Sequence, residues 1–386
     1  MLGRTNLLFT EDKTDLTFSL EYILTPSSNN IIKVENINGL FFVFASDEKV
    51  YYGSDAESLK VLKNGSNYMT AKHIIYADGV YYISTIEKTV GKAIIYKTQD
   101  LSTFEEVTLK NGSSSYSYPV HGLFLSSGGQ IVALITEEKT SMSTSENYLK
   151  FVLIVDSLNN YNANTAQFIE ISSWGYIAER TATYTKMRKD RILTTFNKPT
   201  IINLDGGVAV VQSYESCFYA ANYFFAVDVA NTGKYNNLYY SLNGQQYTKI
   251  NFADVLPKIE VIEIFEYDGN IAMYYKDGAN TSLPPKVAIS TTPNGLVQAV
   301  EDGIPLKMDF TMQKYAVLYK DEYVYIGCAT GVIVKAKIEN YNPLRPDIAV
   351  LKTLAAKQAL KEANEYTERL FAALETRIEA LEEAAN

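Results

Sequence analysis

The chain has 386 residues, of which 47% are hydrophobic and 20% charged, and its formal net charge is −9 at pH 7. This composition is ordinary for a soluble globular protein and excludes a wholly disordered chain. The negative charge disfavours general binding to nucleic acid or to anionic membrane surfaces, and no segment approaches the roughly 20 apolar residues of a membrane span. We therefore expect no nucleic acid partner and no membrane insertion.

The N-terminal region predicts strands rather than a targeting segment. Residues 1–15, MLGRTNLLFTEDKTD, lack the long apolar run of a secretion signal, so synthesis in the cytoplasm is expected. The stretch NLLFTEDKTDLTFSLEYI reads as an outer hairpin without a preceding inner one, whereas the last repeat, from Tyr315 to Ile338, lacks a clear return strand. We predict that the N-terminal strands close the last sheet, which leaves no open edge between the two chain ends.

Six hairpin signals follow along the chain. In each, an apolar or aromatic run precedes a two-residue turn and a second such run, which is how a β-hairpin reads in a sequence. Asn-Gly and Asp-Gly supply the positive φ angles of a type I′ turn, so the turn residues have a mechanical reason. The six turns are Asn38-Gly39, Asp78-Gly79, Gly128-Gly129, Asp205-Gly206, Asp268-Gly269 and Asp321-Glu322.

A second hairpin follows most of the first ones, as in YYGSDAESLKVL and LYYSLNGQQYTKI. Two hairpins make the four strands of a propeller blade, and turn spacings from 40 residues (Gly39 to Gly79) to 77 residues (Gly129 to Gly206) bracket one blade with loop insertions. The longest spacing indicates an insertion. The sequence therefore predicts an all-β fold, a six-bladed β-propeller, with five or seven blades as alternatives.

The composition changes near residue 342, where YNPLRPDIAV carries two prolines. Asp347 can cap a long α-helix that runs to the C-terminus, so we divide the chain into a propeller, 1–342, and a C-terminal helix, 343–386. Apolar residues at heptad spacing favour a coiled coil or a docking helix, and packing on the propeller's own face is the alternative. The predicted oligomerisation residues are Leu360, Asn364, Phe371, Leu374, Ile378 and Leu381.

Aromatic clusters are the candidates for ligand recognition, because tyrosine offers a rigid face and a hydroxyl to a sugar or a protein. With 30 tyrosines in the chain, filling of blade interfaces is the alternative use. Two cysteines and two histidines, His73 and His121, form no metal-ligand or triad pattern, so we predict no metal, no cofactor and no enzymatic activity. The candidate ligand-binding residues are Tyr116, Tyr118, Trp174, Tyr214 and Tyr219.

One second hairpin, Tyr240-Ser241-Leu242-Asn243-Gly244, resembles the degenerate Asp-box repeats of sialidase-like propellers. The complete motif ends in tryptophan, and the single tryptophan, Trp174, stands elsewhere. A sialidase would also need arginines from separate blades to bind the substrate carboxylate, whereas Arg180, Arg188 and Arg191 crowd one segment. The resemblance supports the blade assignment and not the chemistry.

As a whole, a tyrosine-rich propeller with degenerate blades and an oligomerising terminal helix resembles tail, neck or baseplate appendage proteins of bacteriophages. The resemblance implies a virion structural protein that is made in the host cytoplasm and assembled into the particle. Its partners would be further copies of itself, with a trimer as one option, other virion proteins, and a cell-surface glycan. A sialidase-like or other glycan-cleaving enzyme is the alternative, and an intracellular scaffold propeller is a third reading.

Overall fold

A computed structural model describes most of residues 16–339. Within that range it leaves out 87–92, 108–109, 112–113, 116–119, 127, 141–144, 156–166, 171–184, 189–190, 196–198, 204–207, 211–215, 230–235 and 281. The chain divides into two compact units, Met1–Glu339 and Asn340–Asn386, and the following account concerns the first. Apart from Thr367, the helix predicted for 343–386 and its oligomerisation residues lie outside the described residues.

The described strands form seven four-stranded antiparallel sheets. The first three are β2 (Ile31–Ile37), β3 (Leu40–Ala45), β4 (Val50–Gly53) and β5 (Lys60–Val61); β8 (Ala71–Ala77), β9 (Val80–Ile86), β10 (Ala93–Thr98) and β11 (Glu105–Val107); and β14 (Val120–Leu125), β15 (Ile131–Thr140), β16 (Ser145–Val155) and β17 (Gln167–Glu170). The next three are β18 (Thr185–Arg188), β19 (Arg191–Thr195), β20 (Pro199–Asn203) and β21 (Val208–Val210); β22 (Ser216–Ala220), β23 (Tyr223–Val229), β24 (Asn236–Ser241) and β25 (Thr248–Ile250); and β26 (Ile259–Tyr267), β27 (Asn270–Asp277), β28 (Lys286–Ser290) and β29 (Ile304–Pro305).

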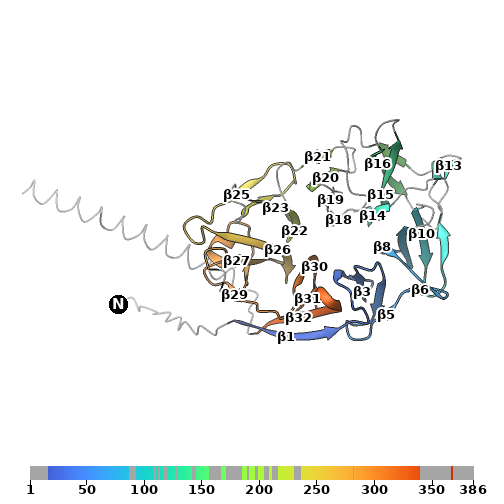
Figure 1. Cartoon of the computed structure of the whole chain (residues 1–386). Coiled ribbons are helices and arrows are strands. Elements are labelled where there is room, and N and C mark those ends of the chain that lie inside the picture. Colours follow the sequence, from blue (N-terminus) through green and yellow to red (C-terminus); the bar gives the residue numbers. More distant parts are fainter. Residues whose placement is uncertain are drawn as a thin grey trace, which may run out of the picture. The chain divides into compact units, whose positions relative to one another are not determined.

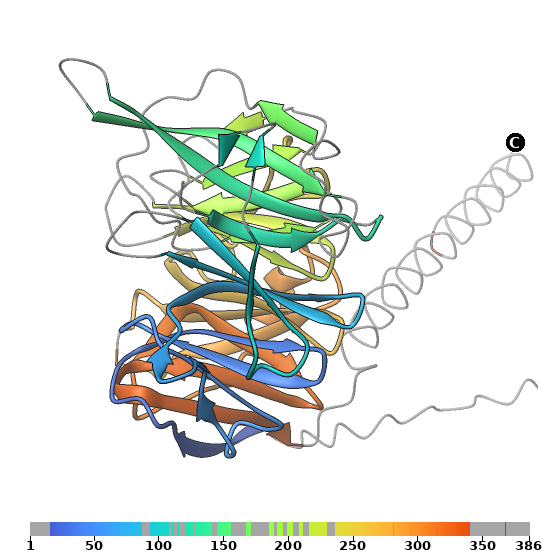
Figure 2. The same ribbon diagram turned by 90° about the vertical axis from the view of Figure 1, so that its right-hand side faces the viewer.

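The seventh sheet joins both ends of this unit. It is made of β30 (Met312–Lys320), β31 (Tyr323–Cys328), β32 (Val332–Glu339) and, outermost, β1 (Thr17–Leu24). Strand β1 pairs with β32 over its whole length, from Thr17 opposite Glu339 to Leu24 opposite Val332. Figures 1 and 2 both show dark blue β1 beside orange β32. The first described strand of the chain thus completes the sheet formed by the last three.

The sheets follow one another around a closed ring. Each first strand contacts the first strand of the neighbouring sheet in the pairs β2 with β8, β8 with β14, β14 with β18, β22 with β26, β26 with β30 and β30 with β2, and β19 contacts β22. Figure 1 shows β8, β14, β18, β22, β26 and β30 toward the middle of the ring. Closing a ring in this way covers both faces of every sheet and leaves only short outer edges.

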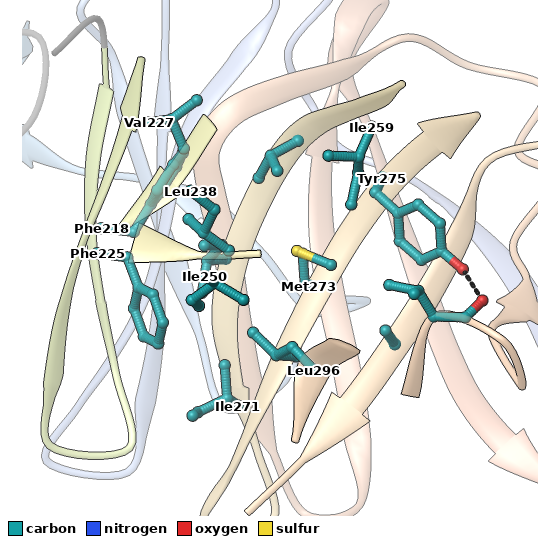
Figure 3. Packing of buried hydrophobic residues seen from close by; sticks show 14 of the residues in the cluster. Phe218, Phe225, Val227, Leu238, Ile250, Ile259, Ile271, Met273, Tyr275 and Leu296 are labelled. Atoms are coloured by element: carbon teal, nitrogen blue, oxygen red, sulfur yellow. Dashed lines mark hydrogen bonds between the residues drawn. The ribbon is translucent and has the colours of Figure 1, made fainter. Parts of the chain in front are cut away.

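Because both faces of a sheet are covered, its strands are apolar almost throughout rather than alternating. All five residues of β22 are buried, as are the first six of β27. The sheets of β22–β25 and β26–β29 enclose one such core, which includes Phe225, Leu238 and Met273 (Figure 3). The Tyr275 hydroxyl in this core donates a 2.8 Å hydrogen bond to the Val300 carbonyl, so the one polar atom of the Tyr275 side chain is satisfied.

The number of sheets differs from the predicted six because two inner hairpins, β18 with β19 and β22 with β23, lack the expected Asn-Gly or Asp-Gly turn. Strands β22 and β23 are joined by Ala221-Asn222, whose φ angles of 46° and 69° are positive without a glycine. The run around Asp205-Gly206, interpreted as an inner hairpin, instead supplies β20 and β21, the outer strands of their sheet. The 77-residue spacing is therefore long partly because it ends in an outer hairpin.

The described residues contain few other elements. Two hairpins, β6 (Lys63–Asn64) with β7 (Asn67–Tyr68) and β12 (Lys110–Asn111) with β13 (Ser114–Ser115), link consecutive sheets. One α-helix, α1 (Leu296–Ala299), lies between β28 and β29, and a 3-10 turn spans Ala329–Gly331. None of the described helices has the length and apolar character needed to cross a bilayer.

Candidate functional site

Of the five predicted ligand-binding residues, the structure describes only Tyr219. Tyr116, Tyr118, Trp174 and Tyr214 lie outside the described residues. Tyr219, on β22, is only 8% exposed. Its ring contacts the Phe224 ring edge-on at 4.9 Å and belongs to a core that includes Leu193 and Ile201 of the preceding sheet. Tyr219 therefore fills an interface between sheets, the alternative use of tyrosine considered above.

Two outer turns share one hydrogen-bond pattern. After β10, the Asp100 carboxylate accepts hydrogen bonds from the backbone N–H groups of Ser102 and Thr103 and from the Thr98 hydroxyl. After β24, the Asn243 side-chain oxygen accepts the corresponding bonds from Gln245, Gln246 and Ser241. The backbone bonds from Thr103 and Ser102 hold the pKa of the Asp100 carboxyl well below its usual range.

Each of these turns packs on the preceding sheet. Leu101 is buried in one core with Phe42 and Tyr81, and the Tyr52 hydroxyl of β4 donates a 3.5 Å hydrogen bond to the Leu101 carbonyl. At the second turn, the Arg191 guanidinium of β19 donates to the Asn243 carbonyl. Each turn therefore holds two sheets together, and we call it an interlock. The Asp100 and Asn243 side chains hydrogen-bond within their own turns.

A cavity of about 480 Å³ lies where the first interlock meets the sheet of β2–β5. Apolar and aromatic residues form part of its lining, and hydroxyl, amide, ammonium and carboxylate groups form the rest. The lining residues are Leu40, Tyr52, Gly53, Ser54, Ser58, Lys60, Tyr81, Gln99, Asp100 and Leu101. We call this cavity the interblade groove. Its volume suits a small ligand of a few sugar rings or comparable size.

The aromatic wall of the interblade groove is held in place from behind. The Tyr52 ring stacks on Phe42 with 6.0 Å between centroids, and the Lys60 ammonium lies 4.8 Å from the Tyr52 ring centroid. Tyr81 is buried, and its hydroxyl accepts a 3.2 Å hydrogen bond from the Asn38 amide. The wall is therefore a rigid surface with a cation at its edge, a combination suited to polar ligands.

A second polar cluster joins three first strands toward the middle of the ring. The Tyr315 backbone N–H on β30 donates a 2.7 Å hydrogen bond to the Glu263 carboxylate on β26, and the Lys314 ammonium contacts the Ser216 hydroxyl on β22. Burial, and secondarily the Glu263 charge, raise the pKa of the Tyr315 hydroxyl. Because these groups bind one another, the cluster fastens three sheets together and presents no set of groups to a substrate.

Metal and thiol chemistry find little support in the part of the chain that the structure describes. No group of three or more His, Cys, Asp or Glu side chains there is placed to hold a metal ion. Burial raises the pKa of both thiols, Cys217 and Cys328, to about 12, so both stay protonated at neutral pH and are poor nucleophiles.

Comparison with known proteins informs the fold alone. No family model and no curated protein matches this chain. A virginiamycin B lyase from Staphylococcus aureus shares 11% identity at a TM-score of 0.50, with 83% of this chain and 99% of the lyase covered. The structure titled "YCF48 bound to D1 peptide" shares 7% identity at a TM-score of 0.55, with 84% and 97% covered. The chain is thus an all-β protein with the β-propeller fold, a fold that hosts unrelated functions.

Sequence reasoning missed the interblade groove. Its two walls come from YYGSDAESLK and KTQDLST, both part of recognised outer hairpins, but the prediction did not place one hairpin against the next sheet. The available signal was the repeated pattern of a hydroxyl residue, one intervening residue and Asp or Asn, seen at Thr98 and Asp100 and again at Ser241 and Asn243. That pattern marks the interlocking turns.

Proposed function

We propose that this protein binds a glycan in the interblade groove and acts as a binding and assembly protein without catalytic activity. The observation that carries the proposal is the groove itself, where the Tyr52 ring, the Lys60 ammonium and the Gln99 amide line one cavity of about 480 Å³. Sugars offer hydroxyl groups to such amide and ammonium donors and apolar ring faces to tyrosine. A rigid aromatic wall also lowers the entropic cost of holding a flexible sugar.

We place this activity in a bacteriophage particle, as a tail, neck or baseplate protein that meets a cell-surface glycan or a neighbouring virion protein. Support for this role comes from the sequence: degenerate blades, abundant tyrosine and a heptad pattern over 360–381. We further propose that the seven described sheets are the full set of blades, and that the C-terminal helix oligomerises or anchors the chain.

The groove proposal predicts the effect of a double substitution. Tyr52→Ala with Lys60→Ala removes the aromatic wall and the cation, and we expect at least about a tenfold loss of affinity, which corresponds to about 1.4 kcal/mol. Binding is first sought on an array of defined bacterial-surface oligosaccharides, and the best binder is then titrated by calorimetry. Sugar release from that binder by the unsubstituted protein would instead favour the glycan-cleaving alternative.

Tyr240 provides a matched control. It stands on β24 one residue before its turn, as Tyr52 does on β4, and its hydroxyl likewise contacts the next sheet, accepting a 3.4 Å hydrogen bond from Asn294. Tyr240→Ala should disturb packing to a similar degree while leaving glycan affinity unchanged. An equal loss of affinity in both variants would mean that the effect is structural and that the groove is not the binding site.

The helix proposal predicts a change in mass. The full chain is expected to sediment as an oligomer, and a chain ending at Tyr341 as a folded monomer, because the heptad positions lie beyond that point. Sedimentation equilibrium measures both masses, and circular dichroism checks that the shortened chain is folded. The same subunit number in both chains would contradict oligomerisation through the helix.

A further inference from the structure

Two lysines beside the interblade groove differ from their neighbours in their surroundings. Lys33, Lys49 and Lys72 form ion pairs of 2.8–3.1 Å with Glu35, Asp47 and Glu48, respectively. Lys60 and Lys63 are exposed, and within the part of the chain that the structure describes neither has an ion pair. In a chain with a net charge of −9, two uncompensated ammonium groups next to a cavity are a local exception.

Both ammonium groups are positioned by tyrosine rings. Lys60 lies 4.8 Å from the centroid of Tyr52 in the groove, and Lys63 lies 4.9 Å from the centroid of Tyr68 on the adjoining hairpin. Tyr68 is 55% exposed, and Lys49 also lies 5.1 Å from its centroid. Lys60 and Lys63 are three residues apart, hence at most about 11 Å between Cα atoms, which is comparable to the Debye length at physiological salt. One extended ligand can therefore reach both.

The hairpin that carries Lys63 has a counterpart in the same position after the next sheet. Lys-Asn-Gly-Ser occurs at 63–66, after β5, and again at 110–113, after β11. The strand registers agree, since Lys63 pairs with Tyr68 and Lys110 with Ser115. The sheets that end in β5 and β11 are the two walls of the interblade groove, and Figure 1 shows β6 and β13 at the outer rim of the ring. Each of these two sheets is thus followed in the chain by a hairpin that begins with lysine.

Two carboxylates, Asp100 in the lining of the groove and Asp55 beside it, accept hydrogen bonds within their own turns. The Asp100 carboxylate accepts its turn's backbone N–H groups, and the Asp55 carboxylate accepts those of Glu57 and Ser58 at 3.1 and 2.7 Å. Hydrogen bonds, first of all from the Ser58 side chain, lower the pKa of Asp55. Both carboxylates therefore point their oxygens at backbone donors of their own turns, while the lysines remain available to a ligand.

We propose that the ligand of the interblade groove is an anionic glycan whose carboxylate or phosphate groups bind Lys60 and Lys63. This inference rests on the proposed glycan binding and adds the charge class of the sugar. Ammonium groups that have no ion-pair partner among the described residues gain a charge-assisted hydrogen bond from such a ligand, whereas a neutral sugar leaves them solvated.

The test compares matched neutral, uronate-containing and phosphodiester-linked oligosaccharides on one array, at low and at physiological salt. We expect the full-length protein to bind an acidic class at least about tenfold more tightly than the neutral class, and the preference to shrink as salt rises. The K60A/K63A variant should lose most of the preference. The two acidic classes distinguish carboxylate from phosphate recognition.

The control is K33A/K72A, which removes two lysines that are paired with carboxylates and should keep the preference. Each other outcome is decisive. Equal, salt-insensitive binding of neutral and acidic sugars would overturn the anionic-ligand inference and leave glycan binding standing. Binding of no oligosaccharide would overturn the proposed function itself. If K60A/K63A keeps the preference for acidic sugars, residues other than Lys60 and Lys63 bind the anionic groups, which would overturn the inference. Circular dichroism verifies that all variants are folded.

Discussion

A chain that begins at Thr25, and so lacks β1, is expected to lose at least about 5 kcal/mol of unfolding free energy, a large part of a typical domain's stability. Strand β1 pairs with β32 over eight residues, and Ile23 is buried in a core with Tyr325 and Ile333. Burial of one isoleucine contributes about 1.5–3 kcal/mol, and backbone hydrogen bonds add about 1 kcal/mol each. Urea denaturation followed by circular dichroism measures the loss.

The matched control begins at Leu16 and keeps β1 whole. It should unfold at the same urea concentration as the full chain, because β1 starts at Thr17. The shorter chain also uncovers the edge of β32, so it should associate at concentrations where the control stays dispersed. If both truncated chains showed the midpoint of the full chain, β1 would not close the seventh sheet in solution.

Most of the fold could be predicted because local turn chemistry and strand hydrophobicity agree. Asn38, Asp78 and Asp268 all have φ of 50°, and each is followed by a glycine with positive φ, as type I′ turns require. Even the weakest signal, Asp321-Glu322, has positive φ at both residues. Each such turn fixes one hairpin without reference to the rest of the chain, so inner hairpins could be located one at a time.

The inner hairpin of β22 and β23 and the groove could not be predicted, for two different reasons. Ala221-Asn222 adopts the left-handed region although alanine does so rarely, and the apolar strands β22 and β23 on either side hold it there. The groove is a tertiary feature, because Tyr52 and Leu101 come from sheets whose relative position no turn signal encodes. Local patterns therefore specify blades, whereas packing between blades specifies the site.

The glycine that lets the first and last sheets meet should be the least replaceable. Gly331 has a φ of +75°, and a Cβ there would lie 1.7 Å from the Ser27 carbonyl oxygen. The Gly331 carbonyl also accepts hydrogen bonds from the Thr25 N–H and hydroxyl at 2.9 and 2.8 Å, which tie the two segments together. Gly331→Ala is expected to cost about 3–5 kcal/mol, from backbone strain and overpacking together. Thermal and urea denaturation measure this loss.

Gly39→Ala separates the two causes. Gly39 has a similar φ of +81°, but a Cβ there would meet no atom within 4 Å, so this variant bears the backbone strain without the clash. It should cost about 1–2 kcal/mol, which leaves about 1–4 kcal/mol of the Gly331 effect to the collision with Ser27. Equal losses at both positions would mean that the Ser27 segment yields freely, and that the junction of the first and last sheets is looser than its hydrogen bonds indicate. A larger loss at Gly331 would instead show that the contact between residues 25–27 and Gly331 is rigid and holds the first and last sheets together.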